Sequence, residues 1–260
     1  MQNSFLNVTE IPGQKATKDQ FSIMRTRYEL AVEHANSDSD VLEIACGSGI
    51  GLGYIANKAK RVVGGDIDEK LLSYGKDTYK EDNSVDVIYL DAHELPFKDA
   101  SFDLILIYEA IYYFKDLNKV FDEVRRVLRP NGKLIISTVN KEWHGFNPSP
   151  FSIRYYTVTE LKKIYESKSM SSEVRLGFKD EIKDKNALVS IIRRIAVKLH
   201  LIPKTMEGKE KLKRLFYGKL ETIPKILQPN TGLLEPLVSY TTELDTLNYK
   251  QIYLIGTLKK

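Results

Sequence analysis

The sequence has a single cysteine, Cys46, and only four histidines and one tryptophan among its 260 residues. One cysteine excludes a disulfide framework, a zinc site built from cysteines, and mechanisms that need two catalytic thiols. No apolar stretch approaches the ~20 residues that a membrane-spanning helix requires. The first 20 residues are polar and lack the apolar core of a secretion signal. These absences predict a protein of the reducing cytoplasm.

A strong overall charge is also missing, because 39 basic and 35 acidic side chains leave a net charge of +4. The distribution is uneven. Residues 1–150 carry 18 basic and 23 acidic side chains, a net of −5, whereas residues 151–260 carry 21 and 12, a net of +9. With 42% hydrophobic residues, a chain of this length can build a large core. We therefore expect a globular protein with an acidic and a basic part.

Between residues 18 and 138, short apolar segments alternate with segments of helical periodicity. Apolar strands separated by helices predict an α/β fold of parallel βαβ units, with helices on both faces of the sheet. Strands are expected at 41–45, 61–66, 85–90, 102–107, 133–139, near 173–178 and at 249–258. Helices are expected at 19–36, from the glycine loop to about 59, near 69–80, at 116–128 and at 157–168.

The remaining long segment, residues 180–246, is expected to be a helical insertion that serves as a lid or as a ligand-binding unit. It contains two apolar stripes at helical spacing, which begin at Leu188 and Leu212. The core domain is then 1–179, completed by 247–260.

The segment from Glu43 to Gly51 joins a predicted strand to a predicted helix and contains three glycines in the spacing G-x-G-x-G. Dinucleotide-binding loops have the different spacing G-x-G-x-x-G. A carboxylate at Glu43 would repel a pyrophosphate, but it suits a cationic ligand that carries an ammonium and a sulfonium.

Two further acids follow predicted strands. Asp66 comes 19 residues after Gly47, at a position where a carboxylate can accept hydrogen bonds from both hydroxyls of a ribose. Asp91 ends the next strand, where it could accept from an adenine amino group or simply form a turn. Asp68 is better interpreted as the N-cap of the following helix.

Taken together, segments 41–51, 62–66, 91–97, 101–107 and 127–138 resemble a class I S-adenosylmethionine-dependent methyltransferase of the small-molecule type. The resemblance implies a Rossmann-like sheet of seven strands, in which the last strand is antiparallel and lies beside the fifth. It also implies S-adenosyl-L-methionine as cofactor. The residues that would bind it are Tyr28, Glu43, Ala45, Gly47, Gly49, Asp66, Ile67, Asp91, Ala92 and Tyr108.

A narrower resemblance is carried by Arg27-Tyr28, by Glu109 and by segments 136–140 and 149–157. These are similar to methyltransferases encoded with bacterial surface-glycan genes, in which Tyr28 would cap the cofactor. The sequence departs from that pattern where Tyr113 and Ser152 replace two histidines.

Methyl transfer is an in-line displacement, for which the protein mainly aligns the acceptor and excludes water. An acceptor hydroxyl benefits from a general base. The candidates for that catalytic role are Glu109, His144 and Tyr113, whereas His93 is interpreted as an ordinary loop histidine. No metal is expected.

The acceptor class is suggested by residues 183–219, which contain 11 basic and 3 acidic side chains, a net of +8. A small anionic acceptor, such as a phosphorylated or nucleotide-linked sugar, explains this charge most simply. One alternative is a lipid-like or quinone acceptor, with residues 186–223 in contact with a membrane surface. Another is RNA, although only Phe216 and Tyr217 interleave aromatic rings with the charges, which makes nucleic acid the weaker interpretation.

Overall fold

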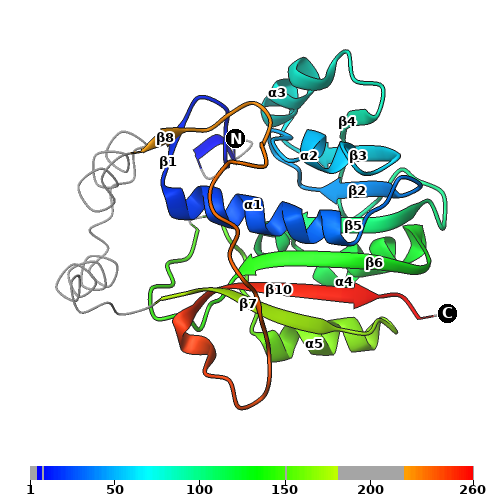
Figure 1. Ribbon diagram of the computed structural model, residues 1–260. Helices are drawn as coiled ribbons and strands as arrows, with labels where there is room; N and C mark the ends of the chain where they lie inside the picture. Colours follow the sequence, from blue (N-terminus) through cyan, green and yellow to red (C-terminus); the bar gives the residue numbers. More distant parts are fainter. Residues whose placement is uncertain (1–4, 8, 150, 181–219, 260) are drawn as a thin grey trace.

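The computed structural model describes residues 5–7, 9–149, 151–180 and 220–259. Its main sheet has eight strands in the order β4-β3-β2-β5-β6-β10-β7-β9 (Figure 1). All seven strands expected from the sequence are present, and the short β9 adds an eighth. The strands are β2 (Asp40–Ile44), β3 (Arg61–Asp66), β4 (Val85–Tyr89), β5 (Phe102–Tyr108), β6 (Leu128–Val139), β7 (Glu173–Lys179), β9 (Val238–Ser239) and β10 (Tyr249–Thr257).

Strands β2 to β6 are parallel to one another, and β10 runs antiparallel between β6 and β7. The expected place of the last strand, beside the fifth, is therefore confirmed. Its segment is apolar, and Ile252, Tyr253 and Leu254 are fully buried. Such a strand is stable only where neighbours cover both of its edges and both of its faces.

Within the described part of the chain, five helices cover the two faces of the sheet. Side chains of α4 and α5 belong to the core on one face, and those of α1, α2 and α3 to the core on the other. Successive residues of β5 alternate between these two cores, as the period of two along a strand requires. The Rossmann-like layers expected from the sequence are thus confirmed. The helices are α1 (Lys18–Glu33), α2 (Leu52–Ala56), α3 (Glu69–Tyr79), α4 (Leu117–Val127) and α5 (Val158–Ser167).

Helix starts follow from local side chains. Thr17 and Gln20 form a capping box at the start of α1, and Asp68 accepts from the backbone N–H groups of Lys70 and Leu71 at the start of α3. The expectation that Asp68 is an N-cap is therefore confirmed. No helix in the described part of the chain is long and apolar enough to cross a membrane.

The expected helical insertion at 180–246 falls largely on residues 181–219, which lie outside the described residues. From 220 to 245 the chain contains no α-helix, so the helical expectation is wrong for this part. Pro224, Pro229 and Pro236 explain the difference, because each proline removes a helical N–H donor. The segment contains β8 (Glu221–Thr222), which pairs with β1 (Lys15–Ala16), and then crosses the outer surface of α1 (Figure 1).

Contacts along α1 hold this crossing segment in place. The backbone N–H of Leu233 donates to Ser22 Oγ at 3.0 Å, and Arg25 donates to the Gly232 carbonyl at 3.1 Å. Polar side chains of α1 thus form hydrogen bonds with backbone groups of this segment that are not paired in a sheet.

Candidate active site

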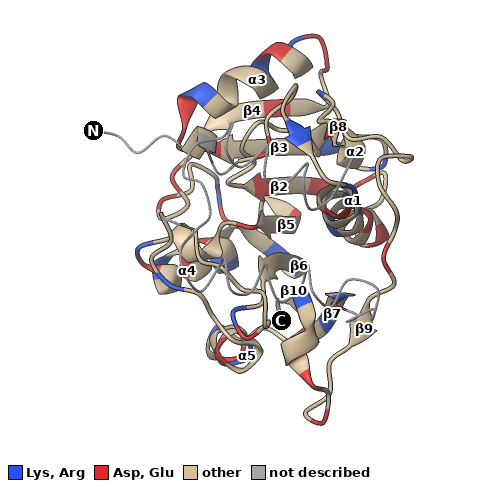
Figure 2. Cartoon of the chain, turned by 90° about the vertical axis from the view of Figure 1, so that its left-hand side faces the viewer, with Lys and Arg blue, Asp and Glu red and all other residues tan. Residues whose placement is uncertain are grey.

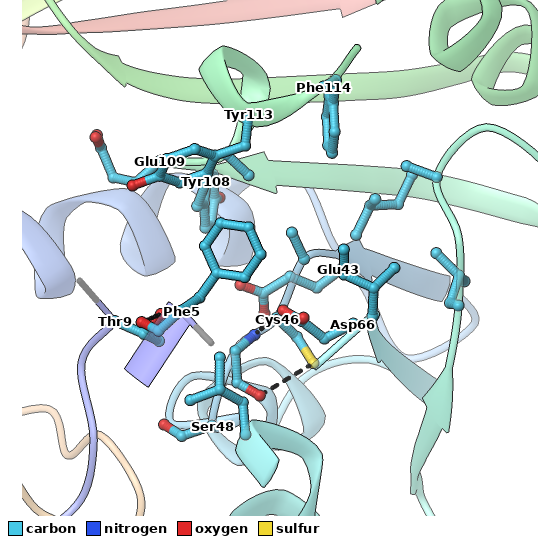
Figure 3. Close-up of a pocket in the computed structure, with 18 of the residues that line it drawn as sticks. Phe5, Thr9, Glu43, Cys46, Ser48, Asp66, Tyr108, Glu109, Tyr113 and Phe114 are labelled. Atoms are coloured by element: carbon cyan, nitrogen blue, oxygen red, sulfur yellow. Dashed lines mark hydrogen bonds between the residues drawn. The ribbon is translucent and has the colours of Figure 1, made fainter. Parts of the chain in front are cut away.

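A cavity of about 420 Å³ lies at the carboxyl ends of the parallel strands (Figure 3). Its walls come from the turns after β2, β3, β4 and β5, from α1, and from the N-terminal segment that contains Phe5, Thr9 and Glu10. The strand order reverses between β2 and β5, and open α/β sheets bind ligands in the crevice at such a switch point. The fold itself thus places the cavity at the edge where ligands are expected.

Most of the residues selected from the sequence line this cavity. Two of them do not: Gly49 and His144. The predicted residues in the lining are Tyr28, Glu43, Ala45, Gly47, Asp66, Ile67, Asp91, Ala92, Tyr108, Glu109 and Tyr113.

Gly49 shapes the loop instead of lining the cavity. Its φ of +75° lies in the left-handed region that glycine adopts at no steric cost, and its carbonyl accepts from the Tyr79 hydroxyl at 2.8 Å. His144 is exposed in a turn after β6, where its backbone N–H donates to the Leu247 carbonyl at 3.0 Å. The structure therefore gives His144 no place at the cavity wall.

Glu43 lies at the end of β2 and is almost completely buried. The Tyr28 hydroxyl donates to its Oε1 at 2.8 Å, while Oε2 is buried without any hydrogen-bond partner. Burial raises the pKa of the Glu43 carboxyl to about 7. A buried acid oxygen without a partner is costly, so this site fits a ligand that donates, and a cationic donor best.

Asp66 ends β3 and is held by two backbone donors. The N–H of Gly47 reaches Oδ2 and the N–H of Asp68 reaches Oδ1, both at 2.9 Å. Burial raises the pKa of this carboxyl. A carboxylate oxygen has a further acceptor position, so each oxygen of this fixed group can accept once more. The arrangement fits a ligand that presents two neighbouring hydroxyls.

Asp91 follows β4 at a more exposed position. It accepts from the backbone N–H of His93 at 2.9 Å and lies 2.7 Å from the imidazole Nδ1 of the same residue. The backbone hydrogen bond from His93 is the main cause that lowers the pKa of the carboxyl. His93 lines the cavity, where its Nε2 accepts from the Asp116 N–H at 3.3 Å. The His93 imidazole therefore lies at the cavity wall in contact with Asp91. The sequence had indicated only an ordinary loop histidine.

Tyr108 closes the inner wall of the cavity. Its hydroxyl donates to the Arg27 carbonyl at 2.7 Å, and its ring meets that of Tyr28 edge to face with centroids 5.3 Å apart. The Arg27 side chain is only 4% exposed, and its guanidinium donates to the Glu10 carboxylate at 2.5 Å. Arg27 and Glu10 both line the cavity.

Glu109 follows β5 with a φ of +52°, an uncommon conformation for a residue with a side chain. Burial raises the pKa of its carboxyl to about 7. The Tyr112 hydroxyl donates to Oε2 at 3.1 Å, and the Gln251 amide, oriented so that its nitrogen is the donor, reaches Oε1 at 2.8 Å. These two donors fix the carboxyl at the cavity wall.

Aromatic rings surround this end of the cavity. Tyr113 packs against Tyr112 with ring centroids 4.5 Å apart and against Phe5 at 5.2 Å, and its hydroxyl donates to Ser149 Oγ at 2.9 Å. Phe114 also lines the wall (Figure 3). The cavity thus has a polar end near Glu43 and Asp66 and an aromatic end near Glu109.

Residues 42–136 match a family model described as "Methyltransferase domain". The chain is 34% identical over 173 residues to a protein of Mycolicibacterium smegmatis named "Probable S-adenosylmethionine-dependent methyltransferase", covering 64% of this chain and 65% of the relative. It is 28% identical over 142 residues to the demethylmenaquinone methyltransferase of Bacillus velezensis, covering 52% and 61%. Both alignments span less than two thirds of the curated relative's own length.

A solved structure shows the same fold over most of the chain. It is the YcgJ protein of Bacillus subtilis, which superposes with a TM-score of 0.58 at 16% identity and covers 90% of this chain and 98% of that one. At this identity the likeness establishes the fold alone. The fold and the family model matched by residues 42–136 agree with the resemblance that the sequence shows in the glycine loop and in the acids at the strand ends.

Proposed function

We propose that the chain is an enzyme that transfers a methyl group, and that residues 42–136, which match a methyltransferase domain model, form a class I S-adenosylmethionine-dependent domain. S-adenosyl-L-methionine supplies an activated methyl on its sulfonium. The acceptor we propose is an oxygen or nitrogen atom of a small anionic molecule. The observation that carries the proposal is the buried Glu43 Oε2 without a partner, at the end of a cavity that also holds the fixed carboxylate of Asp66.

The cofactor residues divide by the chemistry that they offer. Glu43 offers a negative charge to the cationic methionine part, Asp66 offers two acceptor oxygens to the ribose, and Asp91 offers an acceptor to the adenine amino group. Ile67 and Ala92 provide apolar surface for the base. Tyr28 and Tyr108 flank the methionine part, while the backbone from Ala45 to Gly49 allows close approach.

Glu109 is the residue that we propose as general base. A carboxyl whose pKa is about 7 is ionised in half of the molecules at that pH and remains basic enough to take a proton from an acceptor hydroxyl. Tyr112 and Gln251 hold the carboxyl in place, and Tyr113 forms the adjoining wall. We do not assign this role to His144, because it is exposed outside the cavity lining.

The anionic acceptor is supported by the net charge of +8 on residues 183–219. A second candidate, a flat apolar acceptor such as a quinone, is supported by the rings of Phe5, Tyr112, Tyr113 and Phe114 around Glu109. Such rings bind planar molecules well, and one curated relative is named a demethylmenaquinone methyltransferase.

Nucleic acid finds little support in the described helices. Acidic and basic residues are interspersed along α3, α4 and α5 (Figure 2). A duplex or single strand would need a continuous basic surface.

Ligand-dependent thermal stability tests the cofactor. S-adenosylmethionine and its demethylated product should raise the melting temperature, and the Asp66→Ala variant should lose that rise. Asp99→Ala, an exposed acid outside the cavity lining, is the matched control. Stabilisation by NAD in place of these ligands would overturn the proposal.

Binding to RNA and to anionic vesicles, measured over a range of salt concentrations, tests the acceptor class. The proposal expects binding to neither. Salt-sensitive vesicle binding would instead favour the lipid-like or quinone acceptor, and salt-sensitive RNA binding would favour the nucleic-acid alternative.

A further inference from the structure

Strand β10 places one polar side chain beside Glu109. The strand is mostly apolar, but it contains Gln251, which is buried with only 6% of its surface exposed. Because β10 runs antiparallel to β6, its first residues lie beside the end of β6, where Gln251 pairs with Val139 (Figure 1). The backbone N–H of Glu109 donates to Ser137 on the same end of β6 at 2.8 Å. A buried amide is costly unless its polar atoms are hydrogen-bonded, so its partners matter.

The amide nitrogen of Gln251 has two acceptors. It donates to the backbone carbonyl of Thr138 at 3.1 Å and to Glu109 Oε1 at 2.8 Å. A backbone carbonyl can only accept, so Thr138 holds the nitrogen of the amide, and not its oxygen, on this side. Turning the amide over would set its oxygen against the Thr138 carbonyl. The contact with Thr138 therefore determines which atom of the amide Glu109 meets.

Tyr112, the other side-chain donor to Glu109, has no such restriction. Its hydroxyl donates to Oε2 of the carboxylate at 3.1 Å, and a phenol hydroxyl can turn to accept when that oxygen carries a proton. The oriented Gln251 amide can only donate. It therefore stabilises the ionised carboxyl over the protonated one, whereas Tyr112 accommodates both forms.

We propose that Gln251, oriented by the Thr138 carbonyl, is a positioning residue that holds Glu109 in the ionised form that can take a proton from the acceptor. This inference rests on the proposed function, in which Glu109 is the general base. Strand β10 supplies no residue to the cavity lining in the described part of the chain. It contributes to the reaction through one side chain that acts on the base from behind.

Other groups also act on Glu109. Burial raises its pKa, and the nearby Glu10 carboxylate acts in the same direction. The Arg27 guanidinium, the Tyr112 hydroxyl and the Val139 backbone N–H lower the pKa. All of these remain when the Gln251 amide is removed, so its effect can be measured against a constant background. Three further hydroxyls interact with Glu109 and stay neutral because burial raises the pKa of each, and they are those of Tyr113, Tyr155 and Tyr253.

Titration of the carboxyl by NMR tests the proposal without an acceptor. In protein that contains ¹³C-labelled glutamate, the carboxyl signal that disappears in Glu109→Gln is that of Glu109. Gln251→Met keeps the length of the side chain and removes the donor. The titration midpoint of Glu109 should then rise by roughly one to two pH units, the equivalent of a hydrogen bond to a charged group. Tyr112→Phe should raise the midpoint by less.

Ile252→Val is the matched control, since it also alters a buried side chain of β10, but one that faces the opposite core. It should lower the free energy of unfolding and leave the Glu109 midpoint unchanged. Gln251→Glu serves if Gln251→Met does not fold, because it has nearly the shape of glutamine. Its two neighbouring acids should titrate in two steps, one of them well above the wild-type midpoint.

The methyl-transfer rate gives an independent measurement with an identified acceptor. In Gln251→Met, kcat/KM for the acceptor at saturating S-adenosylmethionine should reach its plateau at a pH that is higher by the same interval as the midpoint. The affinity for S-adenosylhomocysteine should not change, because Gln251 lies outside the cavity lining.

The outcomes separate the two proposals. An unchanged Glu109 midpoint in Gln251→Met, or an equal rise in Ile252→Val, overturns the role of the amide and leaves the cofactor and the base as proposed. A Glu109→Gln protein with the wild-type rate overturns Glu109 as the base, and the positioning role of Gln251 with it, even where the midpoint shifts.

Discussion

The hydroxyl of Tyr28 donates to Glu43 Oε1 at 2.8 Å, and both side chains are almost completely buried. The bond joins the middle of α1 to the end of β2, and it leaves the second oxygen of Glu43 facing no protein donor. The hydrogen bond favours the ionised carboxyl, whereas burial favours the protonated one, and burial is the larger effect. The site is thus prepared for a cation that completes the pairing.

Ligand affinity should depend on pH through Glu43. In the free protein its pKa is about 7, and a bound ammonium lowers it, so binding below pH 7 must first release a proton. The affinity for S-adenosylhomocysteine should therefore fall as pH drops below 7, approaching tenfold per pH unit, and level off above it. Titrations between pH 5.5 and 8.5 measure this, and Glu43→Gln should bind weakly with a flat profile. A wild-type profile without this fall contradicts the assignment of Glu43.

Tyr28→Phe should shift the same profile. The substitution keeps the ring and removes the donor, so Glu43 loses the contact that stabilises its ionised form. The midpoint should move to a pH above 7, and the free energy of unfolding should fall by about 1–3 kcal/mol because a buried acceptor is left unsatisfied. Titration gives the midpoint, and denaturant unfolding gives the free energy. An unchanged midpoint with lower stability would mean that Tyr28 only packs.

Glu109→Gln should separate catalysis from cofactor binding. If Glu109 takes the acceptor proton, wild-type kcat/KM for the acceptor, measured with saturating S-adenosylmethionine, should rise as pH increases through about 7, where the carboxyl ionises. The variant should lose about 10²–10⁴-fold in kcat and lose this pH dependence, while its affinity for S-adenosylhomocysteine stays the same. Steady-state rates with an identified acceptor give the profile.

Two comparisons make the Glu109 test specific. Glu81→Gln is the control for removing an exposed acid away from the cavity, and it should leave the rate unchanged. His144→Ala should also leave the rate unchanged, because His144 is exposed outside the cavity lining. A rate loss in His144→Ala as large as in Glu109→Gln would restore the histidine as the base.

The parts of the fold that were predicted correctly are those that local sequence patterns determine. Apolar segments gave the seven long strands, and the acids at the carboxyl ends of β2, β3 and β4 lie at one edge because parallel strands end together. The helix start at Asp68 depends on side chains within three residues. Each of these features is decided over a short stretch of chain.

The features that were missed depend on contacts between distant residues. Nothing in the sequence around Glu10 signals its ion pair with Arg27, 17 residues away. Residues 220–245 did contain a local signal against a helix, in Pro224, Pro229 and Pro236. The helical prediction instead followed the apolar stripe that runs through Leu220 and Ile223. In such cases tertiary contacts determine the conformation of the chain. Leu220 and Ile223 are both buried in the structure, although neither lies in a helix.

The third glycine of the loop, Gly51, supplies the last prediction. A Cβ on Gly51 would lie 1.9 Å from Cζ of the Tyr28 ring, although its φ of −96° suits any residue. Gly51→Ala must therefore displace the ring that carries the hydroxyl bonded to Glu43. We expect a loss of about 1–3 kcal/mol in the free energy of unfolding, as for other overpacked sites, together with weaker binding of S-adenosylhomocysteine. In a Tyr28→Ala background the clash is removed, so the same substitution should cost much less. Denaturant unfolding of the four proteins measures the coupling, and an equal cost in both backgrounds would place the clash elsewhere.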